Sequence, residues 1–259
     1  MNKTIVWGHR GAGFRDVENS MSSFKKAVDM GVDGIKTEAQ LSKDGEIFLC
    51  FQQSLRKNGE DVPIKDLDSA EIRTLQLDNN ESVLTLSEFF SEFKNHNIHY
   101  NFDIQDPEAG IRIIEIARKF KVIDKIELAK TATSPSLLPN IFGKIREFDK
   151  NVKLINTIFL KHATNEKEHL ELESMRKLNI QGINVKYNFA TFELFKLVKE
   201  NGFEFYVWGV LFNRSMQKFL KMNYKGQSVD AMMSNFPDRL VRLRNEIQNN
   251  GKILVVGDS

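Results

Sequence analysis

The chain has 259 residues, of which 41% are hydrophobic and 28% are charged. This composition excludes an intrinsically disordered chain and is typical of one globular domain with a sizeable core. The formal net charge is only +2, from 37 basic and 35 acidic residues. It excludes the strong overall field that draws proteins to nucleic acid, so we expect no nucleic-acid partner.

Short apolar or β-branched runs alternate with longer segments of helical period, which predicts βα units and a parallel sheet. The eight predicted strands cover residues 4–8, 34–41, 98–105, 125–129, 153–159, 182–185, 203–210 and 229–233. The predicted helices include one that begins after Asn19 and Ser20, both of which are cap candidates, and two more at 85–94 and 108–120. A short extended piece at 48–51 precedes a long polar loop from Gln52 to Asp66.

Eight such units in this length favour a closed (β/α)8 TIM barrel in the α/β class over an open doubly wound sheet. We predict a single domain over residues 1–248 and a short C-terminal tail at 249–259. In such barrels the catalytic groups lie at the carboxyl ends of the strands and in the loops that follow. The residues at these positions are His9, Arg10, Lys36, Glu38, Gln52, Asp103, Gln105, Lys130, Lys186 and Trp208.

His9 and Arg10 close the first predicted strand, directly before a glycine-containing turn. Arginine presents a fork of donors to phosphate, and histidine can exchange a proton near neutral pH. The pair therefore suits an anionic substrate. A structural histidine that bonds to the backbone explains the tripeptide equally well.

Lys36 and Glu38 are two residues apart on the second strand, so their side chains point the same way. Asp103 and Gln105 repeat this arrangement on the third strand. Glu38 and Asp103 are the kind of oxygen ligands that hold Mg²⁺ or Ca²⁺. The alternative is that Lys36 forms a salt bridge with one of these acids and closes the end of the barrel.

The ordered motifs of the chain resemble the glycerophosphodiester phosphodiesterase family over nearly the whole length. The match begins with GHRGAG (8–13), ENS (18–20) and GVDGIKTEAQLSKDG (31–45). It continues with IKDLDSAEIRTLQL (64–77), VLTLSEFF (83–90), NFDIQ (101–105), VWGV (207–210) and VDAMMSNFPDRL (229–240). The resemblance implies a TIM-barrel enzyme that uses a divalent cation to cleave a small phosphodiester into glycerol 3-phosphate and an alcohol.

The resemblance also implies roles for individual residues. With the departures described below taken into account, we predict catalysis by His9 and Arg10, a metal at Glu18, Glu38 and Asp103, and substrate contacts from Arg10, Asn19, Lys36, Gln52, Gln105 and Trp208. For three of these the residues themselves allow a structural role: Asn19 as a helix cap, Glu18 as the partner of Arg10, and Trp208 in the core.

The chain departs from the family pattern on the second and third strands. Lys36 stands where the family has the first acid of a Glu-x-Asp metal pair, and an ammonium repels a metal, although it can take the metal's place and neutralise a phosphate. Gln52 stands where the family has its second catalytic histidine, and Gln105 where it has a lysine. Loss of one positioned acid or base typically costs about 10² to 10⁴ in rate.

Two functions remain open at this point, an active phosphodiesterase with an altered site and a catalytically silent relative that binds a phosphate ligand. A lyase that uses a substrate hydroxyl as the nucleophile is a third and weaker hypothesis. The apolar stretch at the N-terminus is too short for the apolar region of a signal peptide, and no run approaches the length of a membrane span, so we expect neither. With Cys50 as the only cysteine, we predict a cytoplasmic protein. The oligomeric state has no sequence signal.

Overall fold

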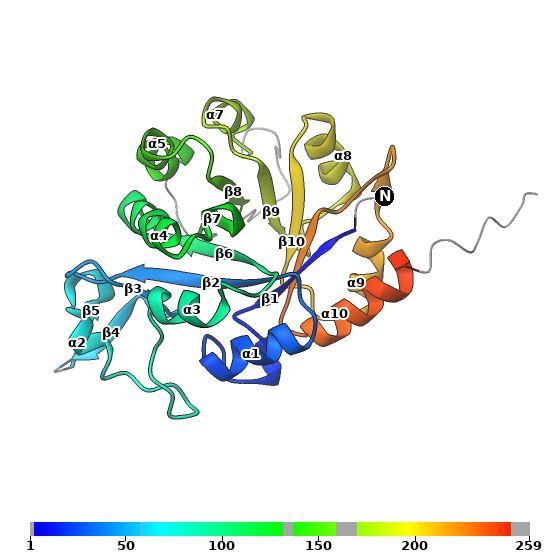
Figure 1. Cartoon of the computed structure of the whole chain (residues 1–259). Coiled ribbons are helices and arrows are strands. Elements are labelled where there is room, and N and C mark those ends of the chain that lie inside the picture. Colours follow the sequence, from blue (N-terminus) through cyan, green and yellow to red (C-terminus); the bar gives the residue numbers. More distant parts are fainter. Residues whose placement is uncertain (1–2, 58, 132–136, 159–169, 250–259) are drawn as a thin grey trace, which may run out of the picture.

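A ring of eight parallel strands forms the centre of the described part of the chain (Figure 1). The computed structural model describes residues 3–57, 59–131, 137–158 and 170–249. The barrel strands are β1 (Ile5–His9), β2 (Gly34–Leu41), β6 (His99–Ile104), β7 (Ile126–Lys130), β8 (Lys153–Ile158), β9 (Gly182–Lys186), β10 (Glu204–Trp208) and β13 (Ala231–Ser234). Because β1 pairs with both β13 and β2, the ring is closed. The predicted (β/α)8 barrel is confirmed.

Helices surround the barrel and join consecutive strands (Figure 1). They are α1 (Met21–Asp29), α3 (Leu86–Phe93), α4 (Pro107–Phe120), α5 (Leu138–Phe148), α7 (Leu172–Lys177), α8 (Phe192–Glu200), α9 (Asn213–Leu220) and α10 (Pro237–Arg244). A π-helical turn, η4 (Asn245–Asn249), follows α10. Several begin with a side-chain cap; Thr85, for example, forms a capping box with Glu88 at the start of α3.

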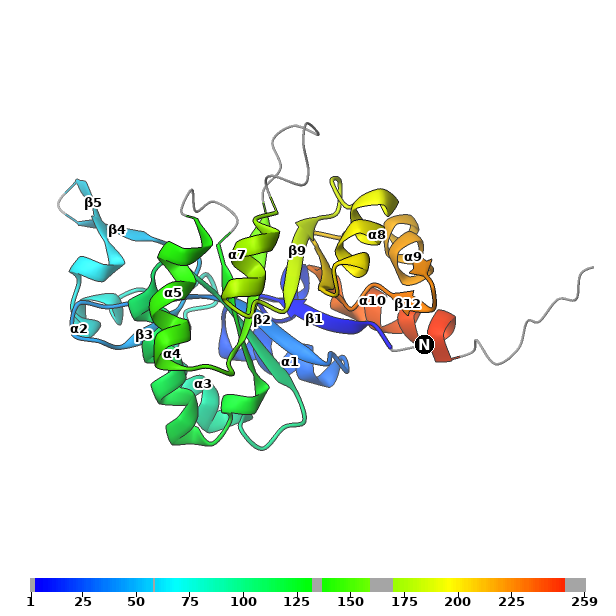
Figure 2. The ribbon, with the colours of Figure 1, turned by 90° about the horizontal axis from the view of Figure 1, so that it is seen from above.

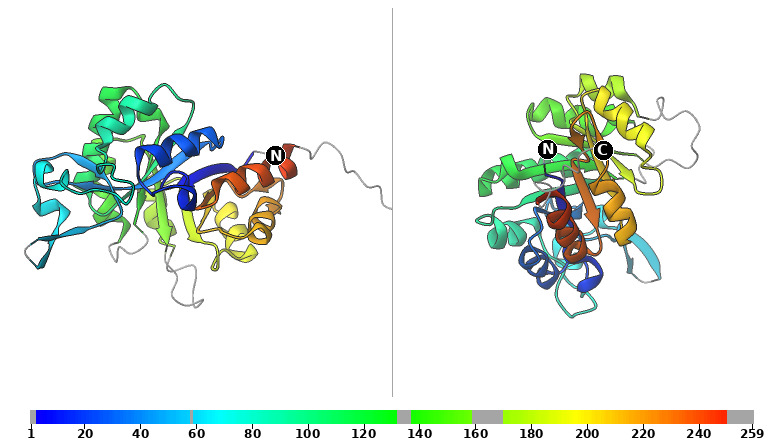
Figure 3. Two further views of the ribbon diagram at one scale, coloured as in Figure 1. Left: turned by 90° about the horizontal axis from the view of Figure 1, so that it is seen from below. Right: turned by 90° about the vertical axis from the view of Figure 1, so that its right-hand side faces the viewer.

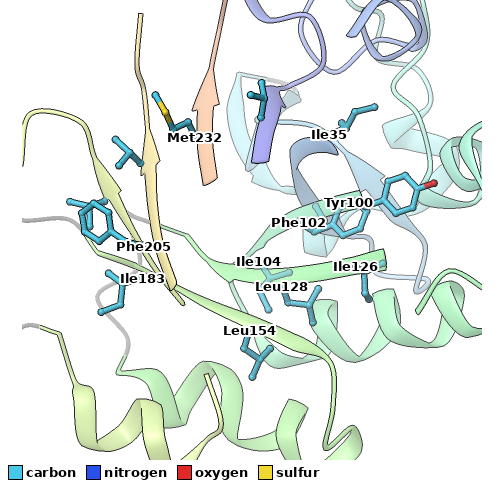
Figure 4. Packing of buried hydrophobic residues seen from close by; sticks show 14 of the residues in the cluster. Ile35, Tyr100, Phe102, Ile104, Ile126, Leu128, Leu154, Ile183, Phe205 and Met232 are labelled. Carbon is cyan, nitrogen blue, oxygen red and sulfur yellow. The ribbon is translucent and has the colours of Figure 1, made fainter. Parts of the chain in front are cut away.

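The buried apolar side chains form two layers because successive residues of a strand point to opposite faces. Along β7, Leu128 belongs to the outer layer under the helices, and Ala129 belongs to the layer inside the barrel. Figure 4 shows the outer layer, to which Phe102 and Leu154 also belong. The inner layer is small and is built around Trp7. Side chains therefore fill the barrel below its mouth.

A small extension follows β2 and replaces the predicted polar loop, so that prediction was wrong. Strand β3 (Ile47–Leu49) pairs antiparallel with β2, and β4 (Ser54–Lys57) and β5 (Glu60–Pro63) form an antiparallel hairpin. The 3₁₀ turn η2 (Ile64–Asp66) and α2 (Ser69–Ile72) complete the extension. Leu55 faces Val62 across the hairpin, and both pack on a separate apolar cluster around Phe48. The strands β4 and β5 each bury only one apolar side chain against this cluster, and this pattern is too weak to predict a hairpin from the sequence.

The extension lies at one end of the molecule, and α10 lies at the other (Figures 2 and 3). Three further short elements connect the units: the 3₁₀ turns η1 (Gly13–Arg15) and η3 (Ile123–Lys125), and the β11–β12 hairpin (Asn223–Tyr224 with Gln227–Ser228). The predicted tail lies outside the described residues from 250 onward. Among the described residues, no helix combines the length and apolar character that a membrane crossing requires.

Candidate active site

The strand register gathers the predicted site residues at one mouth of the barrel. His9 is the register partner of Lys36 on the neighbouring strand, and Glu38 is the partner of Asp103. Trp208 ends β10, which only β13 separates from β1 in the ring. His9, Asp103 and Trp208 lie at or near the carboxyl ends of their strands, and Lys36 and Glu38 are level with them because β2 continues beyond the mouth to Leu41.

A cavity of about 270 Å³ opens at this mouth. Its walls are formed by His9, Arg10, Lys36, Glu38, Gln40, Phe51, Gln53, Asp103, Gln105, Thr131, Thr157, Asn184, Trp208 and Met233. A wider hollow of about 640 Å³ adjoins it between the β1–α1 loop and the extension, and it shares Arg10 and Phe51 with the cavity. The mouth therefore offers an inner pocket for a small polar group and a more open outer part.

The ammonium of Lys36 lies between two carboxylates. Its Nζ donates to Oδ2 of Asp103 in a short contact and lies 3.4 Å from Oε1 of Glu38. Lys36 is only 4% exposed. The salt bridge that the sequence left open as an alternative is present, and it involves both acids.

This pairing sets the ionisation of the three groups. Burial disfavours the charged form of each. Asp103 and Glu38 more than offset that effect at Lys36 and raise its pKa. Lys36 and Arg10 likewise lower the pKa of Glu38 to about 2. For Asp103 burial is the larger effect, and it raises the pKa to about 6 against the attraction of Lys36.

Arg10 also binds Glu38, and it binds Glu18 in addition. Its Nε donates to both oxygens of Glu38, at 2.9 and 3.1 Å, and its Nη1 donates to Oε2 of Glu18 at 2.8 Å. The guanidinium also lies over the ring of Phe51, 4.1 Å from its centroid. Arg10 is thus held by two acids and one aromatic face on the wall of the cavity.

A hydrogen-bond chain fixes the imidazole of His9. Asn235 donates from Nδ2 to Oε1 of Glu18 at 2.7 Å. Because a carboxylate only accepts, Oδ1 of Asn235 must face Nδ1 of His9, 2.9 Å away. The hydrogen of the neutral ring is therefore on Nδ1, and Nε2 keeps its lone pair. Desolvation, followed by the charge of Lys36, lowers the pKa of His9 to about 3, which keeps the ring neutral.

The backbone of Asn235 is held by the loop after β1. Phe14 donates its backbone N–H to the Asn235 carbonyl at 2.9 Å. Gly13 has φ +56°, and a Cβ at this position would lie 2.4 Å from Cα of Asn235. Only glycine allows this close approach. The loop after the first strand and the end of the last strand thus form one unit around His9.

Asn19 is not the cap of α1. Ser20 is the cap, and its side chain accepts from the N–H of Ser23. Asn19 instead has a positive φ of 61° and bridges two residues of β2: it accepts from Oγ1 of Thr37 at 2.7 Å and donates to Glu38 at 3.3 Å. Asn19 therefore positions Glu38, and it lines the wider hollow and not the inner cavity.

Several polar atoms around the cavity are buried without a hydrogen-bond partner in the described residues. They include the donors Nε2 of Gln105 and Nε1 of Trp208 and the acceptor Oδ1 of Asp103. Buried polar atoms are usually paired, so unpaired ones on a cavity wall are positions where a ligand or water completes the bonding.

Some site residues differ in place from the sequence interpretation. Gln52 lines the wider hollow, and Gln53 lines the inner cavity. Lys130 and Lys186, which also end strands, are not among the lining residues. Asn235 was not predicted, although it directly follows β13. The strand-end rule that selected His9 would also have found it.

A model of the glycerophosphoryl diester phosphodiesterase family matches residues 9–239, from the end of β1 into α10. The chain belongs to this family. Among family relatives, the glycerophosphodiester phosphodiesterase of Caldanaerobacter subterraneus subsp. tengcongensis is 24% identical over 250 residues, which cover 93% of this chain and 98% of the relative.

Solved structures of family proteins have the same fold as this chain. The glycerophosphodiester phosphodiesterase of Thermotoga maritima superposes with a TM-score of 0.73 and 22% identity, over 94% of this chain and 99% of the other. A phosphodiesterase of Oleispira antarctica, solved with the product sn-glycerol-3-phosphate, gives a TM-score of 0.76 and 16% identity over 93% and 96%.

Proteins of the glycerophosphoryl diester phosphodiesterase family generally depend on a divalent metal. In this chain the three acids that the resemblance assigns to the metal are each bound to a cationic side chain: Glu18 to Arg10, Asp103 to Lys36, and Glu38 to both. In the part of the chain that the structure describes, no group of three or more His, Cys, Asp or Glu could hold a metal ion. The residues in this arrangement therefore do not fit a divalent cation.

Proposed function

We propose that the barrel mouth binds a small phosphodiester of the glycerophosphodiester class in the cytoplasm, and that hydrolysis to glycerol 3-phosphate and an alcohol is impaired. The observation that carries this proposal is the cavity itself. It combines the cations Arg10 and Lys36 with the unpaired donors of Gln105 and Trp208. Cations and N–H donors that converge on one pocket suit the oxygens of a phosphoryl group. The glycerol 3-phosphate in the Oleispira relative supports this ligand class.

The impairment follows from the proton-transfer groups. Nε2 of neutral His9 can accept a proton at the cavity wall. Hydrolysis of a phosphodiester also needs a group that protonates the leaving alcohol. Gln52 and Gln53 stand where the family pattern has His-Asp, and an amide does not transfer protons at useful pH. The described site thus suits a phosphodiester, but the pKa of about 3 makes His9 a weak base, and the carboxylates of Glu38 and Asp103 are bound to Lys36.

A second candidate function is a catalytically silent module that binds a phosphate ligand for regulation. The Lys36 ion pairs favour it, because they tie up the acids of the site. The two candidates share the ligand and differ only in turnover.

Calorimetric titration of the full chain with glycerol 3-phosphate and glycerophosphocholine tests the proposal, together with turnover of glycerophosphocholine in Mg²⁺ and in chelator. We expect binding that weakens by about tenfold or more in Arg10→Gln, the effect of losing one charge-assisted contact. Arg214→Ala is the matched control, because Arg214 is exposed at the start of α9 and lines neither cavity.

Absence of binding to either compound would contradict the ligand class. Turnover at a rate typical of enzymes, lost in His9→Ala, would contradict the impairment and exclude the silent module. Binding without turnover would favour the silent module.

A further inference from the structure

The buried ammonium of Lys36 occupies the position where a cation would bind between Glu38 and Asp103. We propose that Lys36 is the permanent cation of this mouth, and that the chain holds its phosphate ligand without a divalent metal. The part that concerns the ligand rests on the proposed function. The part that concerns the metal stands on the geometry alone.

The position of Lys36 is fixed from two sides. Its backbone belongs to β2, between the register partners His9 on β1 and Asn101 on β6. Its side chain is 4% exposed, and its Nζ contacts one carboxylate on its own strand and one on the next. A metal ion that entered between Glu38 and Asp103 would have to displace a covalently attached cation of the same sign.

The charges of the site agree with this replacement. Arg10 and Lys36 carry two positive charges, and the carboxylates of Glu18, Glu38 and Asp103 carry three negative ones, so the ionised cluster has one net negative charge. With an acid in place of Lys36 the same cluster would need a divalent cation to reach that net charge. The lysine side chain therefore supplies the electrostatic balance that a metal would otherwise provide.

Lys36 also has a donor left for a ligand. An ammonium carries three N–H groups, and the two carboxylates take two of them. Lys36 lines the cavity, so its remaining N–H can be offered to a phosphoryl oxygen there. Unlike a metal, however, an ammonium has no coordination position for a water, and it cannot generate a bound hydroxide. The replacement thus keeps phosphate binding and removes one source of a nucleophile.

The first test is titration of the unliganded full chain with Mn²⁺ and with Ca²⁺ by calorimetry. We compare the natural chain with Lys36→Met, which removes the cation, and with Lys36→Glu, which also adds a ligand. We expect no cavity binding in the natural chain, weak binding in Lys36→Met because the like charge is removed, and binding tighter than that by about tenfold or more in Lys36→Glu because a carboxylate ligand is added.

Lys186→Glu is the matched control, because it makes the same charge change at the end of β9, away from Glu38 and Asp103. It should gain no metal site. Metal binding by the natural chain that disappears in Glu38→Gln would overturn the proposal. The proposal would also be overturned if the natural chain, Lys36→Met and Lys36→Glu bound the metal with equal affinity. Circular dichroism checks that each variant is folded, and Lys36→Met keeps the comparison decisive should Lys36→Glu fail to fold.

The second test measures the dissociation constant of glycerol 3-phosphate in chelator and in saturating Mg²⁺. We expect the same value in the natural chain under both conditions, and a loss of about tenfold or more in Lys36→Met. A natural chain that binds the ligand only with Mg²⁺ would overturn the proposal. If no form binds glycerol 3-phosphate, the proposed function fails, but the metal titration still decides whether Lys36 holds the cation position.

Discussion

At the scale of single residues, the neighbours of His9 determine its tautomer and its protonation state, which the sequence motif alone does not. The chain of bonds from Glu18 through Asn235 selects one tautomer and leaves Nε2 unprotonated. Desolvation and Lys36 keep the ring neutral. A histidine that stays neutral, with its one hydrogen on Nδ1, can use Nε2 as a hydrogen-bond acceptor or as a weak base, but Nε2 cannot act as an acid.

The low pKa of His9 also affects stability. In the folded chain the ring stays neutral until the pH approaches its pKa of about 3, whereas in the unfolded chain the ring takes up a proton below its ordinary pKa of 6.5. The unfolded state therefore binds more protons in this interval, and this group lowers the free energy of unfolding as the pH falls from 6.5. In His9→Gln the contribution is absent, so we expect a smaller loss of melting temperature over the same interval.

Thermal melts followed by circular dichroism at a series of pH values measure this difference. His99→Gln is the control, because His99 is exposed and starts β6 at the opposite end of the barrel. Its pH profile should match that of the natural chain. Parallel profiles for the natural chain and His9→Gln would show that His9 has the same pKa in the folded and the unfolded chain.

At the scale of elements, the start of α1 holds two site residues in place. Ser20 accepts from the N–H of Ser23 at 3.0 Å and donates to the carbonyl of Val17 at 2.7 Å, and it is fully buried. Glu18 and Asn19 directly precede it. We expect Ser20→Ala to lower the free energy of unfolding by about 1–2 kcal/mol, as for other lost caps. Urea denaturation measures the change.

Ser91→Ala is the control for this variant. Ser91 is exposed in α3, and its hydroxyl bonds only to the Ser87 carbonyl of the same helix among the described residues. The expected change there is within about 0.5 kcal/mol. Equal effects of the two substitutions would mean that the cap contributes nothing specific to α1.

The strands could be predicted from the sequence more fully than the contacts between them. The alternation of short apolar runs with helical segments predicted the eight barrel strands. The alternation of side chains along β2 correctly placed Lys36 and Glu38 on the same face of the strand. Which acid Lys36 would bind depends on the register of β2 against β6, which no local pattern contains. The β4–β5 hairpin was missed because its apolar contacts are few, and Asn235 was missed because the last strand was predicted to end at Met233 and in fact ends at Ser234, directly before Asn235.

At the scale of the whole molecule, one closed barrel pairs its first strand with its last. Strand β1 lies between β2 and β13, and the outer apolar layer runs as a single cluster from Val6 to Leu243. Leu128 is fully buried in that layer (Figure 4). We expect Leu128→Ala to lower the free energy of unfolding by about 2–5 kcal/mol. The substitution leaves a void in the outer layer, and the hydrogen-bonded strands of the closed barrel cannot move to fill it.

Leu137→Ala provides the comparison, since Leu137 is 60% exposed directly before α5. Its expected effect is within about 0.5 kcal/mol in the same urea titration. A cost for Leu128→Ala as small as that of Leu137→Ala would show that the outer layer relaxes around the missing side chain.

The two tryptophans lie in different surroundings. Trp7 is fully buried inside the barrel, and Trp208 lines the cavity; among the described residues the indole N–H of each lacks a hydrogen-bond partner. A ligand that enters the mouth changes the environment of the second indole and leaves the first alone. The fluorescence of Trp208 can therefore report ligand binding without any label, and the emission of Trp7 provides an internal reference.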